Sequence, residues 1–542
     1  MNEQKKIIVT GASGFIGKHF INTFIEDYKI FAIARRSRNE TGIPFHTNLH
    51  WIQCDISNSE SVKFAGEYIQ KAGGADYCLH LAAYYDYSYT DNIAYEIINV
   101  EGTKHILELC KELKIQRFLF ASSLAACNFP KNNEKITEAT EPDANFHYAR
   151  SKKIGERMCL EYSKFFPCSV VRFAAVFSDW CEYAPLNMFL NNWLSRRIES
   201  KFLAGKGESA VTYIHIKDLL VFLNKVIETS LELPNYNILI ASPDEPVTHK
   251  EIFEISNRYF YGHIVKPYFL PKFLALPGLY LKKLLNIFRP SCSEVFERPW
   301  MVKYIDKKLS IDASKTRSII KWSETPRLTL KRRLLFLLEN MKNHPNEWNI
   351  RNAESLKRTA KRINLIIYEK MVLCKDKVLN NLMNYINNSI DNMIFNKYRQ
   401  FTTNDNYCNL SALYHLLLAT IRSTDKSLFL DYIDKIVIRR FAEGYEPKEL
   451  TELFKKFQAE LINQLNTFEE LKNYKQELYD YITFPLQLAQ DEIEDLYDNL
   501  VLKIPEELYI RNANLPDCPE LQKAIKQLSA LYQVAPDEIK HN

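Results

Sequence analysis

Three residues in the first third of the chain have the types and spacing for proton transfer: Ser123, Tyr148 and Lys152. Tyr148 and Lys152 stand four residues apart in "YARSK", so on a helix they share one face. An ammonium near a phenol favours the phenolate and lowers a pKa that is otherwise near 10. We therefore expect Tyr148 to exchange a proton with a substrate oxygen near neutral pH.

Ser123 completes this predicted catalytic set. It ends the apolar run "RFLFASS", which has the composition of a buried strand. Its hydroxyl would hold the substrate oxygen by a hydrogen bond while a nicotinamide takes or gives hydride. Y-x-x-x-K spacing is common by chance, so the prediction depends on the elements that must surround these residues.

A glycine-rich turn near the start of the chain is the first such element. The apolar run 7–9 reads as a buried parallel strand, and a helical pattern follows from Phe15. Between them stand Gly11, Gly14 and Gly17, where backbone N–H groups and the helix dipole can receive a pyrophosphate. The alternative is a glycine turn with no ligand.

The residues that follow the next two predicted strands indicate which dinucleotide binds. An acidic side chain after the second strand would select NAD, but Arg35 and Arg36 stand there and are suited to a 2′-phosphate. We therefore predict NADP, with NAD as the other possibility; the alternative for both arginines is a solvated surface position. Asp55 would accept a hydrogen bond from the adenine amino group, with Ile56 against the ring.

Length and composition limit the class of protein. With 542 residues, 46% hydrophobic residues and a net charge of +5, the chain is long enough for several globular domains and shows no excess charge that would indicate nucleic acid. No charged leader precedes the first strand, so a cytoplasmic location is the default expectation. The eleven cysteines lack C-x-x-C pairs and are expected to be mostly buried thiols, and no metal-ligand cluster is predicted.

The chain divides by pattern into two parts. Up to about residue 340, strand-like runs alternate with amphipathic segments, which is typical of a parallel sheet covered by helices on both faces. From about 350 long helical patterns take over, and only Gly444 of the fourteen glycines lies there. We therefore predict an α/β fold followed by an all-helical C-terminal domain.

These motifs together resemble the extended short-chain dehydrogenase/reductase family, which includes nucleotide-sugar epimerases and dehydratases as well as hydroxysteroid-type oxidoreductases. The resemblance covers about residues 5–335. It implies a Rossmann doubly wound parallel sheet with a small substrate lobe from about 175–205 and 240–310, within a domain 1–345, before the helical domain 350–542. It also implies that the cofactor-binding residues are Gly11, Ser13, Gly14, Phe15, Ile16, Gly17, Arg35, Arg36, Asp55, Ile56, Leu81, Ala82, Ala83, Asn99 and Lys152.

Departures from the family pattern bear on the substrate. Nucleotide-sugar members usually carry an R-x-x-N asparagine and an arginine before the "YIH" aromatic, but Ala175 and Val211 stand there. Dehydratases usually carry an Asp-Glu pair after the catalytic hydroxyl, where this chain has Leu124 and Ala125. A nucleotide sugar and a dehydration are therefore both disfavoured.

Aromatic loops favour an apolar small-molecule substrate instead. Two such loops are expected to border the site, and plain packing is the alternative for them; their residues are Tyr84, Tyr85, Asp86, Trp180 and Tyr183. The apolar segment 268–288 contains prolines and lysines and does not read as a membrane span. It is predicted to pack on the domain or line its pocket, with peripheral membrane contact as the alternative.

The leading hypothesis is an NADP-dependent oxidoreductase that interconverts an alcohol and a ketone or aldehyde, with Tyr148 as acid/base and Lys152 also at the nicotinamide ribose. A nucleotide-sugar epimerase or dehydratase of the same family is the first alternative. A non-catalytic module that senses NADP(H) is the second, because the segment 438–457 is weakly similar to helical sensory domains of bacterial stress regulators. The C-terminal helices are expected to support a homo-oligomer or to dock a protein partner.

Overall fold

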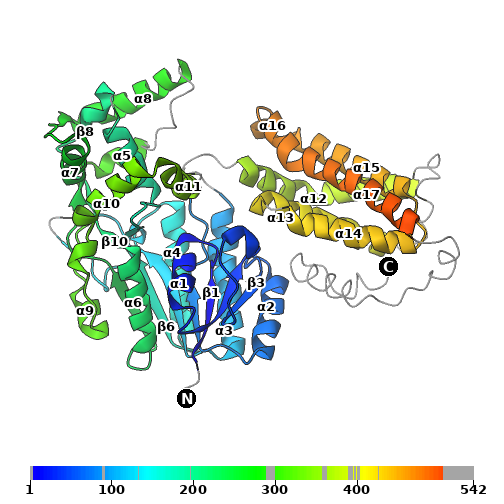
Figure 1. Cartoon of the computed structure of the whole chain (residues 1–542), viewed down its shortest axis with the longest axis horizontal. Coiled ribbons are helices and arrows are strands. Elements are labelled where there is room, and N and C mark those ends of the chain that lie inside the picture. The colour runs from blue at the N-terminus through cyan, green and yellow to red at the C-terminus, as the bar shows by residue number, and fades with distance from the viewer. Residues whose placement is uncertain are drawn as a thin grey trace. The chain divides into compact units, whose positions relative to one another are not determined.

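The computed structural model describes residues 4–87, 92–131, 134–195, 197–288, 299–356, 363–388, 395, 398, 403–424 and 426–503. Contacts between Cα atoms divide the chain into two compact units. The first unit contains residues 1–34, 38–52 and 69–361, and the second contains 35–37, 53–68 and 362–542. Figure 1 shows a sheet with helices in the N-terminal part and helices alone in the C-terminal part. The predicted domain boundaries themselves stay a proposal.

A seven-stranded sheet forms the centre of the N-terminal part, with strand order β11-β6-β5-β4-β1-β2-β3. Short, almost continuously buried apolar runs form most of these strands, and the strand pairs whose register is resolved are parallel. The strand order reverses between β1 and β4, which is where a doubly wound sheet binds its ligand. The strands are β1 (Lys6–Thr10), β2 (Lys29–Ala34), β3 (Leu49–Gln53), β4 (Tyr77–His80), β5 (Arg117–Ser123), β6 (Cys168–Phe173) and β11 (Tyr236–Ala241).

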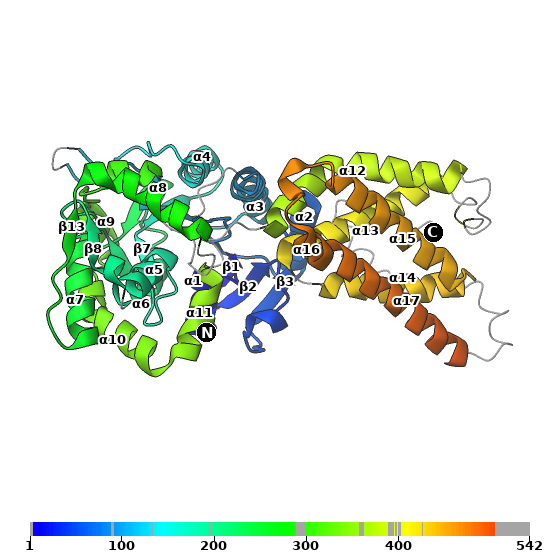
Figure 2. The ribbon, with the colours of Figure 1, turned by 90° about the horizontal axis from the view of Figure 1, so that it is seen from above.

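Helices connect and cover these strands, as the predicted doubly wound fold requires. α1 contacts α6, and α3 contacts α4, so the helices pack in pairs. Figure 2 shows α3 and α4 on one side of β1 and β2, and α1 and α6 on the other. The connecting helices are α1 (Phe15–Phe24), α2 (Ser59–Lys71), α3 (Gly102–Leu113), α4 (His147–Tyr162) and α6 (Ile216–Glu228). The predicted Rossmann fold is confirmed.

Short strand pairs and further helices extend this unit beyond the sheet. β7 (Ala175–Phe177) pairs with β10 (Tyr213–His215), β9 (Ala210–Val211) with β12 (Val247–Thr248), and β8 (Phe202–Ala204) with β13 (Tyr268–Leu270). The helices here are α5 (Ala184–Trp193), α7 (His249–Tyr261), α8 (Lys272–Phe288), α9 (Ser314–Ile320), α10 (Leu330–Asn343) and α11 (Pro345–Leu356). Their apolar side chains form a core cluster of their own, which includes Phe177, Leu190 and Leu334.

The C-terminal part is helical throughout its described residues, as predicted. Its helices are α12 (Ile363–Asn388), α13 (Thr403–Ser423), α14 (Ser427–Ala442), α15 (Pro447–Leu465), α16 (Lys475–Leu478) and α17 (Phe484–Lys503). Pro447 opens α15, as expected of a residue that lacks an N–H. Pro485 lies in the first turn of α17, directly after the π-helical turn Tyr479–Thr483.

Candidate functional site

The turn between β1 and α1 has no space for a side chain at Gly11 or Gly17 and little space at Gly14. Gly11 has φ +68°, and a Cβ there would lie 2.7 Å from the backbone nitrogen of Ala82 at the end of β4. A Cβ on Gly17 would lie 2.5 Å from the Gly11 carbonyl oxygen, and one on Gly14 would lie 3.1 Å from the same atom. The turn is therefore packed against β4 and α1 so closely that side chains are excluded.

The N-terminus of α1 suits a phosphate. Gly14 is its N-cap, no side chain caps it, and its first turn carries no acidic residue. The first N–H groups of a helix lack partners within the helix and carry the positive end of its dipole. Phe15 and Ile16 are the first two helical residues, and Ser13 precedes the cap. These features fit the pyrophosphate of a dinucleotide.

The residues predicted to read the adenosine part follow the strands as expected. Arg35 and Arg36 come directly after β2, and Asp55 and Ile56 come shortly after β3. The carboxyl ends of neighbouring parallel strands meet at one edge of a sheet, which is where a dinucleotide lies in this fold.

Asp55 holds a guanidinium in this structure. Within the second unit it accepts a hydrogen bond from Arg422 Nη1 at 2.7 Å and from the Ser57 hydroxyl at 2.8 Å. Burial favours a raised pKa for Asp55, but Arg422 and Arg35 outweigh it and hold the pKa of this carboxyl below its usual range. Asp55 is therefore a carboxylate acceptor, and its predicted role toward adenine stays a proposal.

A buried network fixes the end of β4, where Leu81, Ala82 and Ala83 follow. The Thr103 hydroxyl donates to the Asn99 carbonyl at 2.7 Å, so it accepts from His80 Nε2 at 3.0 Å. His80 Nδ1 then accepts from the Thr10 hydroxyl at 2.8 Å, and that oxygen accepts the Ala82 N–H at 3.2 Å. This network of hydrogen bonds assigns the tautomer of His80 and ties β1 to β4 beside the glycine turn.

His80 is neutral in this network. Burial, with the nearby charge of Lys152, lowers the pKa of His80 to about 3. An imidazole that both donates and accepts a hydrogen bond is the neutral form. We therefore assign His80 a structural role, as a fixed polar contact inside the sheet.

Tyr148 and Lys152 lie together on α4, as predicted. Lys152 Nζ is 5.6 Å from the centroid of the Tyr148 ring and 5.0 Å from that of Phe120 on β5. The same Nζ donates to the Ala121 carbonyl oxygen at 2.6 Å. Burial lowers the pKa of Lys152 to about 8, against the opposing effect of Glu156. The ammonium is thus held between strand and phenol rather than directed into solvent.

Ser123 stands two residues after Ala121 on β5, so its side chain lies on the same face of the strand. It is partly exposed, and its hydroxyl oxygen accepts the Ala125 N–H at 3.2 Å at the start of the next turn. A hydroxyl whose oxygen accepts this bond keeps its own hydrogen to donate. Ser123 thus ends β5, and Tyr148 and Lys152 lie on α4, where Lys152 binds the carbonyl of Ala121 two residues before Ser123.

Asn99 links the predicted loop to the predicted catalytic helix. It lies in a π-helical turn, Tyr95–Glu101, that leads into α3. Its Oδ1 accepts the Tyr84 N–H at 2.6 Å, and its Nδ2 donates to the Tyr84 carbonyl at 3.0 Å and to the Ser151 hydroxyl at 2.9 Å. Ser151 in turn donates to the Tyr148 carbonyl at 2.8 Å. Asn99, predicted as a cofactor contact, thus also clamps both segments.

A cluster of tyrosines surrounds this point. The Tyr85 ring lies 4.2 Å from the Tyr148 ring and 4.6 Å from the Tyr87 ring, between centroids. Tyr87 contacts Tyr183 edge-on at 6.1 Å. The Tyr84 hydroxyl donates to the buried Asp86 carboxylate. The first predicted aromatic loop therefore does reach the predicted catalytic tyrosine, and Tyr183 from the second loop joins it.

Trp180 packs elsewhere. Its ring lies 4.7 Å from the Arg351 guanidinium and 6.1 Å from the His344 ring, and its carbonyl accepts from Asn352 Nδ2 at 2.8 Å. These partners belong to α11 and to the residue before it. Its predicted role at the substrate stays a proposal, and the contacts that the structure resolves for it are structural.

Two features that position the site were missed by sequence reasoning. Gly155 lets α4 approach β5, because a Cβ there would lie 2.3 Å from the Phe120 ring. Glu156 accepts from Arg172 at 3.1 and 2.8 Å and from the Ser122 hydroxyl at 2.5 Å, inside the core. Their spacing three and four residues after Lys152 was a signal that they share its helix face.

Arg172, three residues before Ala175, has its partners inside the core. It is fully buried, and it donates to Glu156 and, at 2.6 Å, to the Thr140 carbonyl. Its guanidinium is thus committed to a core ion pair and offers no charge to a sugar diphosphate.

Comparison with known proteins agrees with this architecture. Residues 7–239 match the profile of the family described as NAD dependent epimerase/dehydratase. An uncharacterized UDP-glucose epimerase of Bacillus subtilis is 26% identical over 242 residues, which cover 41% of this chain and 72% of that protein. A 2-alkyl-3-oxoalkanoate reductase of Shewanella oneidensis is 30% identical over 156 residues, 28% of this chain and 38% of that protein.

Among solved structures, a UDP-glucose 4-epimerase of Thermotoga maritima superposes with a TM-score of 0.48 and 18% identity, over 63% of this chain and the whole of that one. The predicted resemblance to extended short-chain dehydrogenases/reductases, and with it the prediction of an enzyme domain of that type, is confirmed by the family match. The likeness to the NAD dependent epimerase/dehydratase family is a finding about residues 7–239, which the family model matches.

Proposed function

We propose that the N-terminal part of this protein transfers hydride between a nicotinamide dinucleotide and an alcohol or carbonyl carbon of a small, largely apolar substrate. Tyr148 exchanges the proton with the substrate oxygen, Ser123 orients that oxygen, and Lys152 stabilises the phenolate. The observation that carries the proposal is the buried Lys152 ammonium, which lies 5.6 Å from the Tyr148 ring centroid.

The electrostatics of Lys152 support proton transfer. Its Nζ has one carbonyl partner, Ala121, and two ring faces within 6 Å. In a site of low polarity such a charge stabilises a developing phenolate more strongly than it would in water. A tyrosine in this position serves as base when the substrate is an alcohol and as acid when it is a ketone.

The glycine turn and the N-terminus of α1 would hold the dinucleotide, whose nicotinamide supplies the hydride acceptor or donor. Lys152 is the proposed contact of its ribose, and Ala82, Ala83 and Asn99 would line its path across the sheet edge. Arg35 and Arg36 follow β2 and favour NADP through charge-assisted hydrogen bonds to a 2′-phosphate, each worth about 1.5–3 kcal/mol. NAD is the other possibility, and the family as a whole is described as NAD dependent.

The tyrosine cluster supports an apolar substrate. Tyr85 and Tyr183 bring ring faces and edges to the catalytic end of α4. Arg172 is committed to Glu156, and Val211 stands where sugar-binding members usually carry an arginine. The reductase similar to this chain is named for an alkyl-substituted 3-oxo acid, which has this kind of carbon skeleton.

The second candidate is epimerisation of a nucleotide sugar. The first of the relatives described above is named as a UDP-glucose epimerase. Such an enzyme would begin with the same hydride step at Tyr148, keep its dinucleotide bound and return the hydride to the other face. The missing arginine and asparagine weigh against it, while the shared catalytic set does not distinguish the two reactions.

One experiment separates the two. The full-length protein is incubated with NADPH deuterated at C4 and either a 2-alkyl-3-oxo acid or a ketosteroid, and in parallel with UDP-glucose and oxidised NAD or NADP as the hydride acceptor. A reductase delivers deuterium to the ketone and consumes NADPH in equal amount. An epimerase converts UDP-glucose to its C4 epimer without net consumption of the nucleotide. Absence of both, with NADPH bound, would contradict catalysis and favour an NADP(H)-sensing module.

We further propose that the helical part after residue 350 supports assembly or docks a protein partner. Its core is separate from that of the sheet, and the hydride chemistry uses none of its residues. Sedimentation velocity of the full chain at several concentrations tests whether it forms a homo-oligomer. If the chain is a monomer at every concentration, docking of a protein partner is the hypothesis that stays.

A further inference from the structure

The first unit exposes several large apolar side chains on β8, on β13 and the residues before it, and on the start of α8. Phe273 is 77% exposed, Ile264 71%, Tyr268 59% and Tyr280 57%. We call this set the apolar patch; its members are Phe202, Ile264, Tyr268, Phe269, Phe273, Leu274, Leu276 and Tyr280. Single exposed apolar residues are ordinary on a protein surface, but seven of these eight lie within residues 264–280, and such a concentration favours an interaction site.

The apolar patch is built on ordered, paired backbone. β8 and β13 pair in parallel with Phe202 opposite Tyr268, and the two rings lie 5.6 Å apart. Side chains alternate along β8, so that Leu203 is buried in the core while Phe202 points outward. Ala275 is the buried residue on the described start of α8, and its neighbours on both sides are exposed. The pairing of β8 with β13 and the alternation of side chains along β8 therefore place Phe202 and Tyr268 on the surface.

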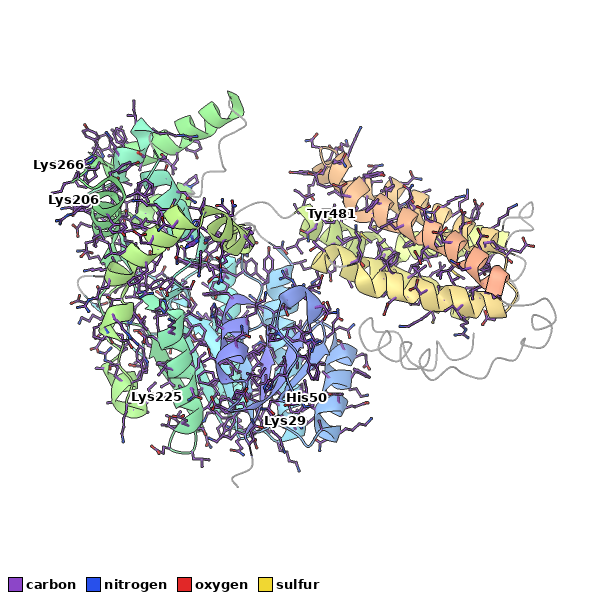
Figure 3. The ribbon with its side chains drawn as sticks, in the orientation of Figure 1. Lys29, His50, Lys206, Lys225, Lys266 and Tyr481 are labelled. Carbon is purple, nitrogen blue, oxygen red and sulfur yellow. The ribbon has the colours of Figure 1, made fainter. Side chains whose placement is uncertain are left out.

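Lysines surround the apolar patch. Lys206 and Lys266 are both exposed at the end of the unit that carries β8 and α7, as Figure 3 shows, and Lys201 and Lys272 are exposed beside the patch residues in sequence. The segment 264–288 contains four lysines and no Asp or Glu.

Two acidic groups lie near β8. Asp306 accepts the backbone N–H groups of Lys206 and Glu208, and Glu208 pairs with Lys308 at 2.6 Å. The segment 264–288 has no acidic residue of its own, so the part of the apolar patch on β13 and α8 is basic in composition.

The length of α8 distinguishes a helix that lies on a bilayer from one that crosses it. It has 17 residues and contains Pro277. Crossing requires about 20 predominantly apolar residues. Among the helices that the structure describes, none is long and apolar enough to cross a membrane. An apolar face bordered by lysines is instead the composition of an interfacial helix, whose lysines reach the headgroups.

We propose that the apolar patch binds the surface of an anionic lipid bilayer, with Phe269, Phe273 and Tyr280 inserted at the headgroup boundary and the lysines on the phosphates. Binding of a second copy of the chain to the apolar patch is the less favoured alternative. Two copies placed patch to patch would bring their basic edges together, and like charges oppose such a contact. Anionic lipid complements both the apolar side chains and the charge.

Flotation of the full-length protein with vesicles tests this proposal, with pure phosphatidylcholine compared with a 70:30 mixture of phosphatidylcholine and phosphatidylserine. We expect binding to the anionic vesicles that weakens from 0.1 to 0.5 M NaCl, because salt screens the lysines. Lys266→Gln with Lys272→Gln should weaken it by roughly 25-fold, from about fivefold for each charge. Phe269→Ser, Phe273→Ser and Tyr280→Ser together should abolish it.

Leu231→Ser is the matched control, since Leu231 is 87% exposed and lies outside the apolar patch. It should bind like the wild type. Circular dichroism and the thermal midpoint show whether each variant folds, and Phe273→Ser alone serves if the triple variant does not. No flotation with anionic vesicles, or equal flotation of wild type and patch variants, would overturn the proposal. The proposal would also be overturned if the wild type formed a dimer and did not bind vesicles, while the triple variant was a monomer.

Discussion

At the scale of single residues, the chemistry of this site depends on a lysine that the fold keeps out of water. Lys152 is 4% exposed and has a single carbonyl partner, and burial lowers its pKa to about 8. Glu156 is the charged group that opposes the effect of burial on Lys152, and the Tyr148 ring centroid lies 5.6 Å from the ammonium, where we expect the charge to stabilise a developing phenolate. Two consequences of this arrangement can be measured separately, one on turnover and one on stability.

Removing the Tyr148 hydroxyl should remove the proton transfer alone. Tyr148→Phe keeps the ring that packs on Tyr85, and we expect kcat to fall by about 10²–10⁴-fold with NADPH affinity unchanged within threefold. Steady-state kinetics and nucleotide titration measure both quantities. Tyr479→Phe, at an exposed position of the helical part, is the matched control and should keep full activity. Turnover of Tyr148→Phe within threefold of the wild type would contradict the assignment.

Lys152 should give stability a distinctive pH dependence. Its pKa is about 8 in the folded state and about 10.4 in an unfolded chain. Between these values the unfolded chain holds a proton that the folded chain has lost, so this term raises the free energy of unfolding as pH rises. Relative to Lys152→Met, we expect the wild type to gain about 2–3 kcal/mol between pH 7.5 and 10.5, measured by urea unfolding. If the free energy of unfolding changed with pH in the same way in both proteins, the pKa of Lys152 in the folded state would be that of an ordinary lysine.

At the scale of elements, the position of α4 against the sheet decides where Tyr148 and Lys152 lie. Gly155 permits the close approach of α4 to Phe120 on β5. Glu156 joins the helix to Arg172 on β6 and to Ser122 on β5. One small residue and one buried ion pair therefore hold the catalytic helix in register with two strands.

A methyl group at position 155 should force the helix and strand apart. Gly155→Ala places a Cβ 2.3 Å from the Phe120 ring, and we expect about 1–3 kcal/mol of destabilisation with reduced activity. Phe120→Leu in the same chain makes room and should recover part of both, which a double-mutant cycle of unfolding measures. Gly278→Ala is the control, because its Cβ would have only an ordinary contact at 3.8 Å. If Gly155→Ala and Gly278→Ala lost the same free energy of unfolding, the close contact with Phe120 would not be the cause.

The buried pair of Arg172 and Glu156 should cost more when one partner is removed than when both are. Arg172→Met leaves a carboxylate uncompensated in the core, and we expect a loss of about 3–5 kcal/mol in denaturant unfolding. Adding Glu156→Gln should return a part of that loss. Lys308→Met breaks the exposed pair with Glu208 and should cost less than about 1 kcal/mol. A similar cost at both pairs would contradict the role of burial.

At the scale of the whole molecule, the apolar side chains form cores that do not share residues. The core of the sheet includes Ile7, Phe20 and Leu239, and the core of the helical part includes Tyr414, Phe457 and Leu486. Separate cores allow separate folding and separate evolution of function. They also make the effect of a ligand on one part measurable in the presence of the other.

Calorimetry of the full chain should therefore show two unfolding transitions. NADPH at about 100 times its Kd should stabilise the sheet part by about 2.7 kcal/mol and raise the temperature of that transition only. Gly17→Ala, which would place a Cβ 2.5 Å from the Gly11 carbonyl, should abolish the shift. A single transition that moves as a whole would mean that the two parts unfold together.

Local patterns account for the parts of the fold that were predicted. Alternating apolar runs and amphipathic segments predicted the strands of the sheet, and the glycine spacing predicted the turn before α1. The spacing of Tyr148 and Lys152 predicted a shared helix face, which the distance from Lys152 Nζ to the Tyr148 ring bears out. The partners of Trp180 on α11 were not predictable, because they lie more than 150 residues further along the chain.

By itself, therefore, the sequence determined the fold class, the glycine turn and the identity of the groups that can transfer a proton. These properties depend on periodicity and on residue type, which are local. Only the tertiary structure decided that Asn99 joins the Tyr84 loop to α4 and that Arg172 forms an ion pair with Glu156. It also decided that β8 and β13 pair with each other and expose apolar side chains. Each of these depends on which distant segments share a core, and local spacing does not encode that choice.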